Sequence, residues 1–301
     1  MDTRRIESRT SRTAEMTCLS RAASYLDSEP HYHSQDHLAV RLLPGIFNAL
    51  FHIPPFRRFF VRRLAPNGIY EYVIARTKYI DAAFAQALNR GFEQILIFGA
   101  GFDTRALRLG PGGGTTRVFE LDAAPTQQAK IQQYHRRGLN IPSNLVFIAI
   151  DFDKEALPDK LDAAGFLNGC KSLFILEGVL MYLAPESVRA TLRTIQTYAG
   201  DGSLLVFDYV RASVLRGERT LYGEAEITQT VSKVGESWRF GLDPDETASF
   251  VADYGFQVCD QKDAQALETA YFQDADGHRV GRVNATHCIL TAEKRNLAKN
   301  L

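Results

Sequence analysis

The feature that most constrains the fold of this chain is a series of five short apolar runs in its central part. Each run has four or five residues, is rich in β-branched and aromatic side chains, and is nearly continuous rather than alternating. That pattern is typical of strands that are buried on both faces of a parallel sheet. The runs occupy residues 95–98, 117–121, 145–148, 173–176 and 204–207.

Helical patterns separate several of these runs, notably over residues 125–137 and 185–198. Strands that alternate with helices and are joined by right-handed crossovers predict an α/β fold with a doubly wound, mostly parallel sheet. Five strands of this kind are too few for an eight-stranded barrel. We therefore expect an open sheet, formed mainly by residues 91–208.

The N-terminal part of the chain has a different pattern. Residues 1–15, which are rich in Arg, Ser and Thr, are expected to form a flexible tail. Residues 16–90 are expected to form a helical cover that is interrupted at prolines. Within it, apolar residues recur at spacings of three and four from about 69 to 89, which predicts one long helix.

The C-terminal part is expected to complete the fold. Strand patterns lapse over residues 209–245, which is too long for an ordinary connection and predicts a cap with helices of its own. Residues 246–301 contain two late apolar runs, near 256–259 and 285–290. We expect these runs to pair as antiparallel strands at the edge of the sheet.

Composition argues against several classes of protein. Lys plus Arg and Asp plus Glu both number 35, so the chain has no net positive charge to attract nucleic acid. No apolar run approaches the roughly 18 residues of a membrane helix, and the first residues lack the apolar region of a secretory signal. The four cysteines have no paired short spacing, which favours free thiols. We expect a cytoplasmic protein with a small-molecule substrate and no membrane span. The sequence does not determine its oligomeric state.

The strongest local motif follows the first expected strand and reads Phe-Gly-Ala-Gly-Phe-Asp-Thr-Arg over residues 98–105. Gly99 and Gly101 allow a tight turn and a close approach of the backbone to a ligand, because they have no Cβ. In a doubly wound sheet such a turn lies beside the cofactor crevice. A dinucleotide fingerprint would have a third glycine at Thr104, which argues against NAD. An ordinary strand-to-helix turn is the plain alternative.

Acidic side chains stand at the ends of the next three expected strands. Glu120 and Asp122 close the second strand, each 21 residues after one of the two glycines. An acid at this place can accept hydrogen bonds from both ribose hydroxyls of an adenosine cofactor. Asp151 and Phe152 follow the third strand and suit an adenine pocket, while Glu177 follows the fourth. Because these strand ends lie on one edge of the sheet, we expect the side chains to converge.

Together these motifs resemble those of the leucine carboxyl methyltransferase family of class I S-adenosylmethionine-dependent methyltransferases, including its bacterial branch of small-molecule O-methyltransferases. The resemblance runs from about residue 13 to residue 294. The matching segments, in the family's order, are Arg76-Thr77, residues 99–105, residues 119–122, Asp151-Phe152 and residues 177–183. The resemblance implies a seven-stranded sheet with a reversed final hairpin, N-terminal helices over it and a cap after the fifth strand. It implies S-adenosyl-L-methionine as the cofactor and S-adenosyl-L-homocysteine as its product.

The resemblance also implies roles for individual residues. The implied cofactor-binding residues are Arg76, Gly99, Ala100, Gly101, Glu120, Asp122, Asp151, Phe152 and Glu177. Arg76 would pair with the methionine carboxylate, which a planar guanidinium can hold with two hydrogen bonds. Asp122, helped by Glu120, would hold the ribose. Glu177 would contact the amino group or face the reaction centre, and Arg21 is a further basic candidate near the cofactor.

Chemistry narrows the expected acceptor only slightly. A carboxylate acceptor is already ionised at neutral pH, whereas a hydroxyl generally benefits from a base. No histidine stands in the strand-end motifs, which mildly favours a carboxylate. Glu177 and Tyr182 are the expected catalytic residues, with Tyr182 positioning a substrate oxygen. The expected substrate-binding residues are Tyr182, Tyr209, Tyr222 and Trp238, with packing in the core or the cap as the alternative for each.

Three other features are given structural interpretations. His287 stands in an apolar strand and is expected to be a core histidine. Residues 31–37 are similar to the metal-binding run of metallo-β-lactamase-like hydrolases but have one residue too many, so we interpret Asp36 as a helix cap and expect no metal. The basic and aromatic residues 56–63 favour a solvated helix face over a membrane or partner surface, and their role stays open.

The sequence thus predicts an S-adenosyl-L-methionine-dependent O-methyltransferase that acts on a carboxylate or hydroxyl of a small metabolite. A catalytically silent binding module for the cofactor and, less favoured, an NAD-linked oxidoreductase are the alternatives. Residues 235–242 in the cap look like the bacterial branch, and no segment maps to recognition of a protein phosphatase tail. A large protein acceptor is therefore disfavoured.

Overall fold

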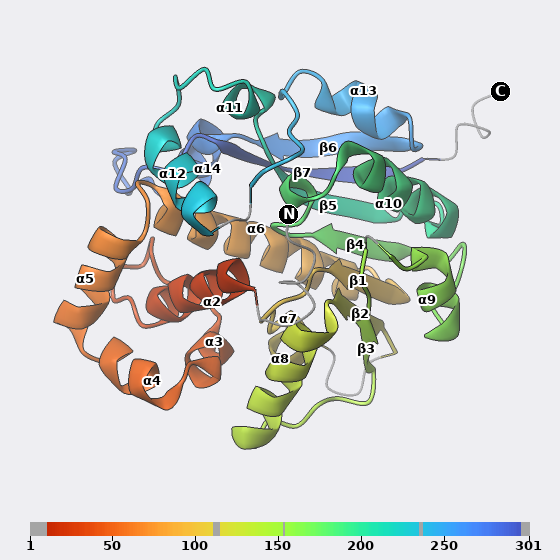
Figure 1. Cartoon of the computed structure of the whole chain (residues 1–301), viewed down its shortest axis with the longest axis horizontal. Coiled ribbons are helices and arrows are strands. Elements are labelled where there is room, and N and C mark those ends of the chain that lie inside the picture. Colours follow the sequence, from red (N-terminus) through yellow and green to blue (C-terminus); the bar gives the residue numbers. More distant parts are fainter. Residues whose placement is uncertain (1–10, 111–114, 153, 235–236, 296–301) are drawn as a thin grey trace.

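The computed structural model describes residues 11–110, 115–152, 154–234 and 237–295. Its centre is one seven-stranded sheet with the strand order β3-β2-β1-β4-β5-β7-β6 (Figure 1). The strands are β1 (Gln94–Phe98), β2 (Arg117–Asp122), β3 (Leu145–Ala149), β4 (Ser172–Leu176), β5 (Leu204–Val210), β6 (Phe256–Lys262) and β7 (His287–Lys294). Strands β1 to β5 are parallel, and β7 lies antiparallel between β5 and β6. The expected doubly wound sheet with a reversed final hairpin is confirmed.

Helices cover both faces of this sheet (Figure 1). The apolar core on one face is shared by α6 (Ile69–Asn89), α8 (Ala124–Arg136) and α14 (Ala264–Tyr271). It extends outward through α2 (Arg12–Tyr25), α3 (His37–Leu42), α4 (Gly45–Phe51) and α5 (Pro54–Leu64). The other face packs against α9 (Leu157–Ala163), α10 (Pro185–Tyr198) and α13 (Thr247–Ala252). The short elements are α7 (Arg105–Arg108), the 3₁₀-helix η1 (Leu180–Tyr182) and α11 (Ala212–Leu215), and the cap contributes α12 (Glu224–Val234).

Burial on both faces explains the continuous apolar runs. In β1, Ile95 and Ile97 belong to the apolar cluster on one face, while Leu96 and Phe98 belong to the cluster on the other. Successive side chains of a strand point to opposite faces, so a strand covered by helices on both sides needs apolar residues at every position. All five residues of β1 are buried, as are all seven of β5.

Helices α2 to α6 make up the N-terminal part of the described chain. Helix α2 begins at Arg12, because the Ser11 side chain accepts a hydrogen bond of 3.2 Å from the Ala14 amide and caps the helix. The expected tail was longer, and its residues 1–10 lie outside the described part of the chain. Helix α6 has the expected bounds. Asp36 caps α3 as predicted, accepting a hydrogen bond of 3.0 Å from Ala39.

The cap leaves the sheet after β5 and returns to the same place. The Leu242 amide donates to the Val210 carbonyl at 3.0 Å, and the Ala212 amide donates to the Leu242 carbonyl at 3.1 Å. The start and the end of the cap are thereby joined at the carboxyl end of β5, and α12 belongs to the segment between them in the sequence (Figure 1). Residues 235 and 236 of the cap motif lie outside the described residues.

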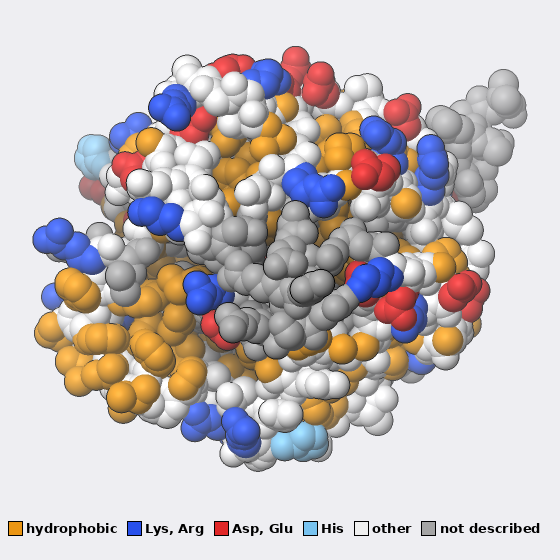
Figure 2. All heavy atoms as spheres, in the orientation of Figure 1, with side chains coloured by type: hydrophobic (Ala, Val, Ile, Leu, Met, Phe, Trp, Pro, Cys, Tyr) orange, Lys and Arg blue, Asp and Glu red, His pale blue; other side chains and the backbone are white. Residues whose placement is uncertain are grey.

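Apolar side chains gather on the surface over α4 and α5 (Figure 2). Ile46, Ile53 and Phe59 are exposed there, while Phe60 is buried. The aromatic side of α5 is therefore only partly covered, in contrast to the expected solvated helix with a buried aromatic face. Among the helices of the described residues, none is both long and apolar enough to cross a membrane.

Candidate functional site

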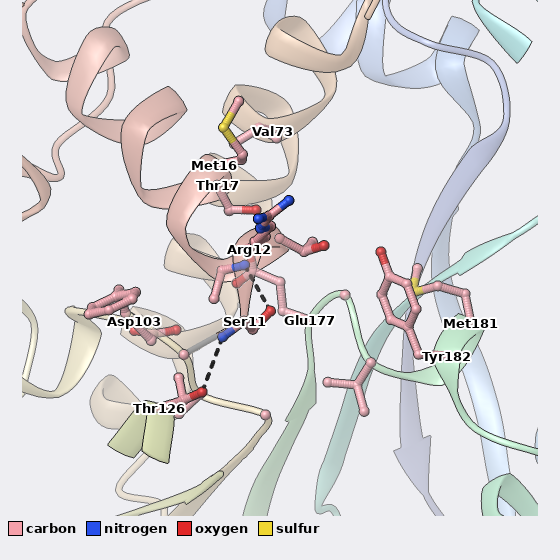
Figure 3. A pocket seen from close by; sticks show the side chains of 18 of the residues that line it. Ser11, Arg12, Met16, Thr17, Val73, Asp103, Thr126, Glu177, Met181 and Tyr182 are labelled. Carbon is pink, nitrogen blue, oxygen red and sulfur yellow. Dashed lines mark hydrogen bonds between the residues drawn. The ribbon is translucent and has the colours of Figure 1, made fainter. Parts of the chain in front are cut away.

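A cavity of about 570 Å³ lies at the edge of the sheet where the parallel strands end. Its lining comes from the first turns of α2, from α6, from the loops after β1 to β4, from α12 and from the start of β7 (Figure 3). The expected site residues that line it are Arg76, Gly99, Ala100, Gly101, Asp122, Asp151, Phe152, Glu177, Tyr182 and Trp238. The structure therefore brings together residues from across the whole motif set, as the common strand edge requires.

The glycine turn after β1 is held in a conformation that glycine adopts most easily. Gly99 and Gly101 have φ values of 55° and 48°, in the left-handed region. A Cβ on Gly99 would lie 2.7 Å from a methyl group of Val179, and a Cβ on Gly101 would lie 3.0 Å from Ala14. The turn is thus packed between α2 and the loop after β4. Only a residue without a side chain fits there.

Asp122 at the end of β2 anchors this turn. Its carboxylate accepts hydrogen bonds from the backbone amides of Gly101 and, at 2.7 Å, of Ala123. Burial raises the pKa of Asp122, and the two amide donors oppose that effect. The acid therefore has a structural task in the turn as well as a position in the cavity wall.

A buried ion-pair cluster forms the floor of the site beside β4 and β5. The two carboxylate oxygens of Glu177 pair with different arginines: Oε1 lies 3.0 Å from Nε of Arg76, and Oε2 lies 2.7 Å from Nη1 of Arg105. Burial alone would raise the pKa of Glu177, but the two guanidinium groups outweigh it and hold the pKa below its usual value. Glu177 therefore stays a carboxylate, suited to binding a cation and unsuited to taking up a proton.

Asp208 in β5 completes the cluster and was missed by the sequence reasoning. This fully buried carboxylate lies 2.7 Å from Nη1 of Arg76 and accepts hydrogen bonds from the Tyr72 hydroxyl at 2.8 Å and the Gly178 amide at 2.6 Å. The signal was present, because Asp208 is an acid near the carboxyl end of an apolar strand, like Asp122 and Glu177. The expected fifth strand was ended one residue before it.

Salt bridges extend this cluster across the loop after β1. The linked groups are the carboxylates of Asp36, Asp81, Asp103, Glu177 and Asp208 and the guanidinium groups of Arg21, Arg76, Arg105 and Arg108. Arg21, the weaker candidate, lines the cavity and donates to the Phe102 carbonyl at 2.6 Å. With five carboxylates and four guanidinium groups, the cluster carries a formal excess of one negative charge, which favours a cationic ligand.

Three expected site residues lie away from the cavity lining. Glu120 is buried against Lys130 of α8 at 2.6 Å, and burial raises its pKa to about 7. Tyr209 follows Asp208 in β5 and so points to the opposite face, where its hydroxyl accepts a hydrogen bond of 3.0 Å from Gln261. Tyr222 lies on a separate surface depression, under Arg282.

The remaining wall of the cavity is largely apolar and aromatic. Tyr182 and Met181 of η1 stand across the cavity from Ser11 and Thr126, as Figure 3 shows. His287 is buried, as the sequence predicted, and it also lines the cavity, which the sequence did not predict. The strand order, in which β7 lies antiparallel beside β5, places His287 at this edge of the sheet.

The chain matches the model of the leucine carboxyl methyltransferase family over residues 14–196, which is more than half of its length. It belongs to this family. A relative from Mycobacterium avium, provisionally named an S-adenosyl-L-methionine-dependent methyltransferase, is 32% identical over 58% of this chain and 53% of its own. A Bacillus subtilis relative of the same provisional name is 26% identical over 67% and 66%. The chain spans about half to two thirds of the length of these relatives.

A solved structure supports the fold independently. A Thermobifida fusca protein described as a methyltransferase has a TM-score of 0.58 with 16% identity, over 92% of this chain and 94% of its own. At this identity the likeness concerns the fold alone. It confirms the Rossmann-like class I methyltransferase architecture that the motifs predicted.

The described residues of this family member fit S-adenosyl-L-methionine, the cofactor that the motifs indicated. The glycine turn provides a cradle that a side chain would fill. Within the described residues, Nη2 of Arg76 makes no hydrogen bond, although Nη1 and Nε are engaged, so it is free to meet a carboxylate. The charged carboxylate of Glu177 suits an ammonium group, and the negative excess of the ion-pair cluster suits a cationic cofactor.

Burial of His287 predicts a dependence of stability on pH. Burial, with help from Arg76 and against Asp208, lowers the pKa of His287 to about 4. Because the unfolded histidine titrates near its ordinary pKa of about 6.5, the unfolded state gains a proton first as pH falls, and stability is lost. Between pH 7 and pH 5 we expect this group to cost on the order of 2 kcal/mol of unfolding free energy.

The measurement is urea unfolding at both pH values for the wild type, His287→Gln and His278→Gln. The glutamine at 287 should remove this part of the pH dependence. His278 has a side chain that is 78% exposed, so its replacement should leave the dependence unchanged. Equal slopes in all three proteins would contradict the expectation.

Proposed function

We propose that this protein is an S-adenosyl-L-methionine-dependent O-methyltransferase that transfers a methyl group to a carboxylate or hydroxyl of a small metabolite. One observation carries the proposal: the strand-end residues of a methyltransferase family converge on a single cavity. The cavity volume of about 570 Å³ is within the range of pockets that hold small ligands. It must accommodate both the cofactor and the acceptor, which favours a small acceptor.

Different residues of the cavity would bind different parts of the cofactor. Nη2 of Arg76 would hold the carboxylate of the methionine part, and Glu177 its ammonium group. Asp122 would accept hydrogen bonds from the ribose hydroxyls, and Asp151 with Phe152 would meet the adenine. When bound, S-adenosyl-L-methionine supplies an electrophilic methyl group on a positively charged sulfur.

The other residues of the cavity would exclude water and align the acceptor. Met181, Tyr182 and Trp238 provide an apolar and aromatic wall, and residues of α2 and α12 line other parts of the cavity. Alignment of the reacting atoms in a dry site is the main requirement for methyl transfer. Tyr182 would position the acceptor oxygen. The charged Glu177 would bind the cofactor and take no part in proton transfer.

Calorimetric titration of the purified chain tests the proposal directly. S-adenosyl-L-methionine and S-adenosyl-L-homocysteine should bind with micromolar dissociation constants, because the site combines paired charges with a preformed glycine cradle. NAD should give no heat, because Thr104 stands where its fingerprint needs glycine. Absence of binding for both adenosyl ligands would reject the proposal, whereas binding without methyl transfer to any acceptor would favour a silent binding module.

Substitutions at Asp122 and at Glu120 should have different effects on the dissociation constant of S-adenosyl-L-methionine. Asp122→Asn should weaken S-adenosyl-L-methionine binding at least tenfold, because it removes the charge that accepts the ribose hydroxyls. Glu120→Gln should change the dissociation constant less than threefold, because that carboxylate faces Lys130. Circular dichroism checks that both variants fold. A strong loss in the Glu120 variant alone would reverse the assignment.

The glycine cradle can be tested with a matched pair of substitutions. Gly99→Ala should weaken cofactor binding at least tenfold, because the new Cβ would stand 2.7 Å from Val179 and displace the turn. Gly91 also has a positive φ, of 66°, but a Cβ there would meet nothing within 4 Å. Gly91→Ala therefore carries a similar backbone strain without the contact and should bind the cofactor normally. Equal losses would mean that the strain alone is responsible.

A further inference from the structure

A chain of hydrogen bonds fixes the orientation of the Asn284 side chain, just before β7. Its Nδ2 donates to the Asn67 carbonyl at 2.8 Å. The other end, Oδ1, accepts from the Thr286 amide at 3.1 Å and lies 2.5 Å from the Thr286 hydroxyl. An amide oxygen can only accept hydrogen bonds. The Thr286 hydroxyl must therefore donate its hydrogen to Asn284.

This donation decides which nitrogen of His287 carries a proton. The Thr286 hydroxyl has one hydrogen, which is used on Asn284, so toward His287 it can only accept. Nδ1 of His287 lies 2.7 Å from that hydroxyl oxygen and must be the donor. In a neutral imidazole the other nitrogen then has no hydrogen. Nε2 of His287 is therefore a free hydrogen-bond acceptor and a base.

The strand order places this base in the cavity. Because β7 runs antiparallel to β5, its first residue, His287, pairs with Val210 at the edge where the parallel strands end. The imidazole stacks on Tyr72 with the ring centroids 4.5 Å apart, and Trp238 meets it edge-on at 5.2 Å. Among the described residues Nε2 has no hydrogen-bond partner, and it is not one of the fully enclosed polar atoms. His287 is one of the residues that line the cavity.

The charged groups around the imidazole act on its basicity in opposite directions. Asp208 on β5 and Arg76 on α6 are the charged neighbours that affect its pKa, and Tyr72, also on α6, covers one face of its ring. Burial keeps the imidazole neutral at pH 7, with its pKa lowered to about 4. Asp208 would stabilise the imidazolium that forms when Nε2 takes up a proton. The ring is therefore unprotonated at neutral pH with a lone pair available on Nε2, although burial makes it a weaker base than an exposed histidine.

We propose that His287 is the general base of the methyl transfer and that the acceptor is a phenolic hydroxyl. The inference rests on the proposed function and narrows its acceptor. A carboxylate acceptor would be ionised already and would need no base, whereas a phenol, with a pKa of about 10, does. Tyr72, Trp238 and Tyr182 give the cavity aromatic walls that suit a phenol ring.

The reaction step balances with the groups named. The phenol oxygen forms a bond to the methyl carbon, and the bond from that carbon to sulfur breaks with its electron pair remaining on sulfur. The hydroxyl proton moves to Nε2 of His287 and afterwards leaves to solvent. Nδ1 keeps its hydrogen bond to Thr286 throughout, so Thr286 acts as a positioning residue that holds the tautomer.

The tautomer can be measured without any acceptor. In protein labelled with ¹⁵N-histidine, nitrogen NMR at pH 7 in the S-adenosyl-L-homocysteine complex should show His287 with a protonated Nδ1 and an unprotonated Nε2. The His287→Gln spectrum assigns the signals. Thr286→Val should disturb this tautomer, and Thr286→Ser should restore it, because serine retains the hydroxyl. A proton on Nε2 of the wild type would overturn the inference.

The acceptor class is tested with two probes of similar shape, 4-methylphenol and 4-methylbenzoate, with radiolabelled S-adenosyl-L-methionine. The wild type should methylate the phenol faster than the benzoate. His287→Gln should lower kcat/KM for the phenol at least a hundredfold, within the range of general-base catalysis. The His278→Gln control should retain full activity, and S-adenosyl-L-homocysteine should bind all three proteins within threefold.

The outcomes separate the two levels of the proposal. A wild type that does not methylate the phenol faster than the benzoate, or a His287→Gln variant that keeps its phenol activity, overturns the role of His287. Methylation of the benzoate alone would leave the proposed function standing. Failure of the wild type to bind S-adenosyl-L-methionine would instead reject the proposed function, while the nitrogen spectrum would still report on the imidazole.

Discussion

The structure of the site depends on the pairing of Glu177 with Arg76 and Arg105 in a buried place. Charges removed from water are costly unless each meets a partner of opposite sign. Glu177 satisfies one arginine with each oxygen, and Asp208 satisfies a second nitrogen of Arg76. The pairs tie α6, α7, β4 and β5 together at the strand edge. Loss of one partner would leave another charge buried and unpaired.

The same cluster prepares the cavity for its ligand. Arg76 keeps one nitrogen free among the described residues, and the cluster as a whole has an excess of negative charge. On the proposed function, a ligand that carries a carboxylate, an ammonium and a charged sulfur would find a complement for each group without a large rearrangement of the protein. This preorganisation reduces the cost of binding. Beside it, Tyr72 connects the ion pairs to the aromatic part of the cavity, through Asp208 on one side and His287 on the other.

We expected side chains at the carboxyl ends of parallel strands to converge, and most of the expected residues do line one cavity. The expectation failed for residues whose position depends on a helix or on an antiparallel strand. It requires only that parallel strands share an edge, so it placed Gly99, Asp122 and Glu177 in the cavity correctly. It does not say what a helix brings to the same place, and Lys130 of α8 pairs with Glu120 and leaves it outside. It also says nothing about a strand that runs the other way. The burial of His287 at the start of β7 was therefore predicted, but its place beside the cavity was not.

The sequence by itself determined the fold class, the parallel strands, the bounds of α6 and the glycine turn. These features depend on the order of residues along a few turns or one strand, where local geometry and burial on two faces act directly. Only the tertiary structure decided that Asp208 meets Arg76, that Tyr209 faces away, and that His287 faces the cavity. Those placements depend on contacts between distant segments and on the insertion of β7 between β5 and β6. The proton on Nδ1 of His287 is decided in the same way, because its hydrogen bonds lead back to Asn67, far away in the chain.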